Sequence, residues 1–168
     1  PVIPKIKEIV RSGLIGKLLS VRAEVCEYVP YYHKYEDYRD TYVSKKEQGG
    51  GVILSQIHEI DYLIDIFGDP ESVFAIGGKR SRLEIDVEDN VDILMKRNDL
   101  AIFLHMDFIQ KKRRRRGVIY GEDGVIEYDL QQTHLRLINT EGIENHNWEN
   151  FDRNQMFLDE IKHFIDCS

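Results

Sequence analysis

The sequence has few of the features that indicate export, membrane insertion or a structural metal. No run approaches the roughly 20 apolar residues that a membrane-spanning helix requires. The first 25 residues lack the basic, apolar and small-residue order of a signal peptide. Only Cys26 and Cys167 are present, without the CxxC or Cys/His spacing of a zinc site. We therefore expect a cytoplasmic protein with no metal site and no membrane partner.

Two nucleotide- and metal-binding motifs are incomplete. The triple glycine at residues 49–51 is followed by Val-Ile-Leu, so the third glycine of the dinucleotide-binding G-x-G-x-x-G fingerprint is missing. His58 and Glu59 begin like the zinc-protease HExxH, but Tyr62 stands where the second histidine is required. The chain therefore carries neither a Rossmann fingerprint nor a zinc-protease motif.

The chain is acidic on balance, with 23 Lys and Arg against 30 Asp and Glu. The net charge of −7 disfavours nucleic acid as a partner. The run KKRRRR at residues 111–116 suggests polyanion binding. In a strand, however, its side chains would alternate between two faces. We therefore favour a solvated strand edge or an interface arm, and polyanion binding is the weaker alternative.

The hydrophobic pattern predicts helices before and after a run of strands. Helical spacing covers the residues before Gly13, residues 52–67 and residues 156–165, and alternation over residues 18–28 predicts a half-buried strand. Further strands are predicted at residues 72–77, 90–96, 101–108, 117–120, 125–128 and 134–137. Helices do not alternate with strands, so we predict an α+β fold with a mostly antiparallel sheet.

The length and the two ends bear on domain organisation. A chain of 168 residues fits one domain. Both ends run directly into helical patterns, whereas a domain boundary normally falls in a polar linker. We expect residues 1–16 to be a helix and link from a preceding domain. We expect residues 17–168 to form the α+β domain, truncated at its C-terminus.

An irregular segment is the first candidate for function. Residues 29–48 have no clear period, although their aromatic residues argue against disorder. Aromatic faces pack against sugar rings, and phenol, guanidinium and ammonium groups bind hydroxyl or anionic groups. A packed surface loop or an oligomer contact explains the composition equally well. The candidate substrate-binding residues in this segment are Tyr32, His33, Tyr38, Arg39, Tyr42, Lys45 and Lys46.

A family resemblance rests on three segments in order. GGGVILSQIHEIDYLIDIFGDPESV at residues 49–73 resembles the second-domain motif of the Gfo/Idh/MocA oxidoreductases, in which a triple glycine leads into a histidine-bearing helix. IKEIVRSGLIGKLLSVRAEV and HMDFIQKKRRRRGVIYGEDGVIEYDL are similar to two other family segments, so the likeness covers nearly the whole chain. It implies a domain like the C-terminal domain of glyceraldehyde-3-phosphate dehydrogenase, with an open, predominantly antiparallel sheet, helices on one face, and the N-terminal Rossmann domain absent from this chain.

The resemblance also implies an activity. It implies hydride transfer between NAD or NADP, bound mainly by the absent domain, and a sugar, nucleotide sugar or polyol hydroxyl. It implies a homo-oligomer built through the open sheet face, and an isolated chain that is inactive. A non-catalytic oligomerisation or ligand-binding module is the alternative function.

The resemblance places the catalytic histidine at His58. Imidazole exchanges a proton near neutral pH, as oxidation of an alcohol requires. Asp61 lies three residues further along the helix, where it would orient the ring or contact substrate. We expect Gly50 and Gly51 to let the cofactor approach. Ser55 stands where many relatives have an aspartate, so orientation or proton relay must differ here. The alternative for His58 is a packed structural histidine.

Overall fold

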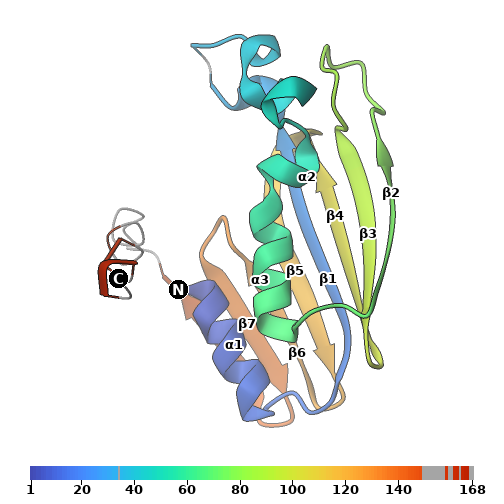
Figure 1. Ribbon diagram of the computed structural model, residues 1–168. Coiled ribbons are helices and arrows are strands. Elements are labelled where there is room, and N and C mark those ends of the chain that lie inside the picture. Colours follow the sequence, from blue (N-terminus) through green and yellow to red (C-terminus); the bar gives the residue numbers. More distant parts are fainter. Residues whose placement is uncertain (34, 149–157, 159–160, 163, 167–168) are drawn as a thin grey trace.

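The structure of the protein is a computed structural model that describes residues 1–33, 35–148, 158, 161–162 and 164–166 (Figure 1). Within these residues one sheet has eight strands, in the order β2-β3-β4-β1-β5-β6-β7-β8. β1 and β4 are parallel, and the other neighbours pair antiparallel. The strands are β1 (Leu18–Tyr28), β2 (Ser72–Gly78), β3 (Asn90–Arg97), β4 (Leu100–Asp107), β5 (Ile109–Gly121), β6 (Gly124–Asp129), β7 (His134–Asn139) and β8 (Gly142–Asn147).

Helices cover one face of this sheet and leave the other open. Helix α1 (Val2–Ser12) and helix α3 (Ile57–Phe67) lie on the same face, and the short helix α2 (Val52–Ser55) precedes α3 (Figure 1). The predicted α+β class with an open, mostly antiparallel sheet is confirmed. The 3-10 turns η1 (Val29–Tyr31), η2 (Tyr38–Asp40), η3 (Tyr42–Ser44) and η4 (Lys46–Gln48) lie beyond one end of the sheet (Figure 1).

Several predicted boundaries need correction. The expected continuous helix at 52–67 is interrupted at Gln56, whose φ and ψ are −113° and 25°. β5 begins at Ile109, well before the predicted residue 117, because the basic run pairs with β1. β8 was missed because GIENHN has no alternation of apolar residues. Of the helix predicted at 156–165, the described residues 158, 161–162 and 164–165 are helical, and the others lie outside the described residues.

The core lies between the sheet and the covering helices. Val21 and Val25 on β1 and Leu104 on β4 are buried in one hydrophobic cluster with Ile6 of α1 and Leu63 of α3. Each such fully buried aliphatic side chain contributes about 1.5–3 kcal/mol. This apolar contact holds α3, and therefore His58, against the sheet.

The opposite face of the sheet is only partly polar. Phe74, Ile76, Leu94 and Phe103 all expose apolar surface on it. They border a hollow of about 940 Å³ that is lined by residues of strands β1 to β7. None of the described helices is long and apolar enough to cross a membrane.

Candidate functional site

His58 is the second residue of α3, and its side chain is exposed to solvent. Its ring makes no hydrogen bond or ion pair with any described residue, including the neighbouring Asp61. His58 is therefore not packed in the core of the described part of the chain. The expected orientation of the ring by Asp61 is not observed in the described part of the chain.

The neighbouring Glu59 points the opposite way, into the protein. It is only 1% exposed, and Arg115 Nε on β5 donates to its Oε1 at 2.6 Å. Burial raises the pKa of Glu59, and the Arg115 guanidinium offsets part of that shift. Because consecutive helical residues are about 100° apart, the inward Glu59 leaves His58 on the exposed side of the helix.

A second buried contact anchors the same helix one turn later. The hydroxyls of Tyr62 on α3 and Tyr128 on β6 are 3.0 Å apart, and their rings meet edge to face. Gly117 makes room for this pair, because a Cβ at that position would overlap the Tyr128 hydroxyl. Burial raises the pKa of both phenols, so both remain protonated.

The break before α3 connects the helix to a polar cluster. Gln56 Nε2 donates to Glu27 Oε2 at 2.6 Å and to the Tyr32 hydroxyl at 2.8 Å. Burial and the Glu27 carboxylate raise the pKa of Tyr32, which keeps the phenol protonated. The hydroxyl of Ser55 is buried and has no hydrogen-bond partner within the described residues. The side chain of Gln56 thus bonds to the strand and to the aromatic segment.

Glu27 and Tyr32 border a hollow of about 330 Å³, and Tyr32 and His33 are the predicted substrate residues in its lining. The full lining is Glu27, Tyr28, Tyr31, Tyr32, His33, Lys111 and Arg113. Arg113 pairs with Glu27, and the Lys111 ammonium lies 5.8 Å from the centre of the Tyr28 ring. Sequence reasoning missed Glu27, Gln56 and Arg113, because strand register and the helix break bring them here.

The other predicted substrate residues are not part of this hollow. Tyr38 accepts a hydrogen bond from the backbone of Glu84 at 3.2 Å, and Arg39 binds the Glu84 carboxylate at 3.0 Å. The backbone N–H of Lys46 donates to Asp86 at 2.8 Å. These contacts join the irregular segment to residues 84–86. The remaining positions are the exposed Tyr42 and Asp61 and the half-buried Lys45, which pairs with Asp40 at 3.6 Å.

The two glycines predicted to admit a cofactor are in close contact with the chain itself. Gly50 N–H donates to Lys45 O and Gly51 N–H to Val43 O, each at 2.9 Å. Gly51 has φ of 110°, and a Cβ there would overlap the Glu88 carboxylate. Both glycines are therefore required by the turn into α2, and their role toward a cofactor stays a prediction.

The basic run is divided between two faces, as alternation in a strand predicts. On the helix-covered face Arg113 pairs with Glu27 and Arg115 with Glu59. On the open face Arg114 and Arg116 both pair with Glu24, at 3.9 and 2.5 Å. Because four arginines already have carboxylate partners, the run offers little free charge to a polyanion.

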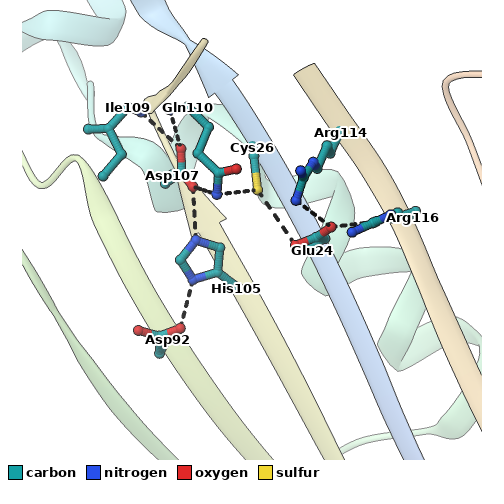
Figure 2. A network of polar contacts seen from close by, with 9 residues as sticks. All are labelled: Glu24, Cys26, Asp92, His105, Asp107, Ile109, Gln110, Arg114 and Arg116. Carbon is teal, nitrogen blue, oxygen red and sulfur yellow. Dashed lines mark hydrogen bonds and ion pairs between the residues drawn. The ribbon is translucent and has the colours of Figure 1, made fainter. Parts of the chain in front are cut away.

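A polar network on the open face was not predicted from the sequence (Figure 2). His105 Nδ1 lies 2.7 Å from Asp92 Oδ1, and His105 Nε2 lies 2.9 Å from Asp107 Oδ2. Gln110 Nε2 donates to Asp107 Oδ2 at 2.7 Å and to Cys26 Sγ at 3.1 Å. Cys26 and Asp107 are partners in the parallel pair of β1 and β4.

The network perturbs the titration of its members. The Asp107 carboxylate, helped by Cys26 and Asp92, raises the pKa of His105 to about 11. Burial works to raise the pKa of Asp107, but the bonds from His105 and from backbone N–H groups hold it below its ordinary value. Burial raises the pKa of the Cys26 thiol. The only sequence signal was a histidine and an aspartate two residues apart on the polar side of a strand.

Comparison with known proteins agrees with this fold. Residues 3–127 match the family model of the GFO/IDH/MocA C-terminal domain. Among solved structures, the chain is similar to an oxidoreductase from Agrobacterium radiobacter in complex with NAD+, L-tartaric acid and magnesium, at 20% identity and a TM-score of 0.72, over 90% of this chain and 45% of that chain. An NAD-binding oxidoreductase from Klebsiella pneumoniae shows 16% identity and a TM-score of 0.72, over 88% and 44%. Levoglucosan dehydrogenase in complex with NADH and levoglucosan shows 17% identity and a TM-score of 0.71, over 84% and 42%. No curated protein sequence matches the chain.

The open antiparallel sheet with helices on one face is the C-terminal-domain architecture that the resemblance implied. The chain belongs to the GFO/IDH/MocA family, and it corresponds to the C-terminal domain of that family. It spans less than half the length of the three solved structures.

Proposed function

We propose that this domain provides the acid/base residue and part of the substrate pocket of an NAD(P)-dependent oxidoreductase. The substrate class is a sugar, nucleotide sugar or polyol with a reactive hydroxyl. The observation that carries the proposal is the exposure of His58 at the start of α3, two residues beyond the Gln56 side chain that reaches the Tyr32 hollow. Family membership and the dinucleotide-bound neighbours support a nicotinamide cofactor.

His58 acts on the proton of the reacting hydroxyl. When bound, the nicotinamide accepts the hydride from the carbon that carries this hydroxyl. An exposed imidazole with no partner in the described chain can take the hydroxyl proton in oxidation and return it in reduction. The aromatic and basic lining of the nearby hollow suits the apolar face and the polar groups of a sugar.

Cofactor binding falls mainly to a dinucleotide-binding domain outside this chain. The described residues hold no Rossmann unit, and the N–H groups of Gly50 and Gly51 are bonded within the chain. Leu54 and Ile57 expose apolar side chains on the helices beside His58, which supports contact with a further domain there. The chain alone should be inactive. Calorimetry should detect no binding of NAD+ or NADP+ to it, and tight binding would contradict this division of roles.

A second candidate function is assembly of a homo-oligomer through the open sheet face. The exposed side chains of Phe74, Leu94 and Phe103 favour it, because such apolar surface is normally buried by a partner. Sedimentation equilibrium should show self-association of the protein, and Phe103→Glu should shift it toward monomer. Tyr35→Glu, an exposed aromatic position away from the sheet, should leave it unchanged. A wild-type protein that stays monomeric at high concentration would rule out this interface.

We also propose a cytoplasmic location. Cys26 is buried and free, which supports our inference of a reducing cytoplasm. Cell fractionation that recovers the protein in an exported fraction would contradict it.

A further inference from the structure

Three side chains of metal-ligating type meet on the open face of the sheet, on the side opposite His58. Cys26 lies on β1, and His105 and Asp107 lie two residues apart on β4. One ligand atom from each lies within 4.8 Å of the other two. In a tetrahedral zinc site, metal–ligand lengths of about 2.0–2.3 Å place ligand atoms roughly 3.3–3.7 Å apart. Shifts of about 1 Å in side-chain position would therefore complete such a site.

Hydrogen bonds from other residues already orient two of these three side chains (Figure 2). Asp92 Oδ1 binds His105 Nδ1 at 2.7 Å, which leaves Nε2 directed toward Asp107. Metal-binding histidines characteristically donate their second nitrogen to a carboxylate in this way. Asp107 Oδ1 accepts the backbone N–H groups of Ile109 and Gln110, both at 2.9 Å, so Oδ2 faces the cluster.

Two of the three ligands are buried, and the third is reached by solvent. Cys26 is fully buried and the Asp107 side chain is 0% exposed, whereas the His105 side chain is 30% exposed. His105 borders the large hollow together with Asp92, which gives an ion a route from solvent. The nearby carboxylate of Glu24 is neutralised by Arg114 and Arg116, which leaves Cys26, His105 and Asp107 as the ligand set.

We propose that Cys26, His105 and Asp107 form a binding site for Zn²⁺ on the open face of the sheet. A thiolate, an imidazole and a carboxylate together select zinc over magnesium or calcium, which prefer oxygen ligands only. Three protein ligands leave the fourth position for water. This revises the expectation of no metal site, which rested on spacing along the chain and not on strand pairing.

The test uses Co²⁺ as a spectroscopic substitute for Zn²⁺ in the protein, reduced and freed of metal with a chelator. Co²⁺ should bind with one equivalent and give the thiolate-to-cobalt charge-transfer band, and Zn²⁺ should displace it. Cys26→Ser should abolish the band, and Cys167→Ser, which removes the other thiol of the chain, should retain it. Mg²⁺ should not compete. A wild-type protein without the band, or a Cys26→Ser variant that keeps it, would overturn the site.

Two further variants separate ligation from folding. Asp92→Asn should weaken Zn²⁺ binding by about 10–100-fold, since it removes the carboxylate behind the histidine. His134→Gln, which borders the same hollow but is not in the cluster, should bind as the wild type does. If Cys26→Ser does not fold, His105→Gln decides instead. It should weaken Zn²⁺ binding at least as much as Asp92→Asn does, and binding as tight as that of the wild type would overturn the proposal.

Discussion

The buried pair of Glu59 and Arg115 is the contact whose removal should most affect the position of α3. Arg115→Met leaves a carboxylate that is 1% exposed without its cation. Breaking a buried ion pair in this way costs about 3–5 kcal/mol. The Arg115 side chain retains 28% exposure, so water already weakens the pair, and we expect about 3 kcal/mol.

The free energy of unfolding that Arg115→Met loses should depend on pH. Burial raises the folded-state pKa of Glu59, so the carboxyl is tolerated in the fold more readily when protonated. The folded protein holds the Glu59 proton more tightly than the unfolded chain does. The stability that this proton contributes is complete below the pKa of Glu59 in the unfolded chain, and it is lost as the pH rises through the pKa of Glu59 in the folded protein. Removal of Arg115 raises that folded pKa further. Arg115→Met should therefore be more destabilising at neutral pH than at acidic pH.

Urea unfolding followed by circular dichroism at both pH values measures these effects. The matched control is Arg114→Met, the next residue of β5, which points to the open face and lies 3.9 Å from Glu24. Its loss should cost about 0–1 kcal/mol. A free energy of unfolding that is equal for the two variants, or a loss for Arg115→Met that grows toward acidic pH, would refute the reasoning.

Two smaller predictions concern the turns and the tyrosine pair. Gly51→Ala should destabilise the protein by about 1–3 kcal/mol in the same unfolding assay, because φ is 110° and the added Cβ overlaps Glu88. Gly13→Ala, where φ is 76° but a Cβ meets nothing, should cost less. Tyr62→Phe should cost about 1–3 kcal/mol, because it removes the buried partner of the Tyr128 hydroxyl. The double variant Tyr62→Phe/Tyr128→Phe should be no worse than the single one, and a doubled loss would show that the two hydroxyls act independently.

The elements that follow a regular apolar pattern were predictable from the sequence. β1 alternates over residues 18–28, and the apolar stripe of residues 57–67 determines α3. The break at Gln56 was not predictable, because its side chain bonds to Glu27 and Tyr32, which a helical pattern does not report. β5 was predicted too short because its basic residues are stabilised by carboxylates on β1 and α3.

The two candidate sites also differ in how far the sequence alone predicts them. His58 could be located through its motif, and its exposure follows from its place beside the buried stripe of α3. The cluster of Cys26, His105 and Asp107 could not, because it depends on the parallel register that joins residue 26 to residue 107. Local spacing contains no information about such a pairing. Of the predicted substrate residues in the irregular segment, only Tyr32 and His33 border the hollow, and the role of the segment stays a prediction.

The central claim is that His58 performs acid/base chemistry, and turnover of a His58→Gln variant tests it most directly. The measurement uses the protein joined to the dinucleotide-binding domain that the proposal requires, with NAD+ or NADP+ and a panel of sugars, nucleotide sugars and polyols, and reduced nicotinamide is followed by absorbance. The account predicts that His58→Gln lowers kcat/KM by about 10²–10⁴-fold, while His134→Gln on the opposite face leaves it unchanged. Wild-type turnover by His58→Gln would contradict the assignment.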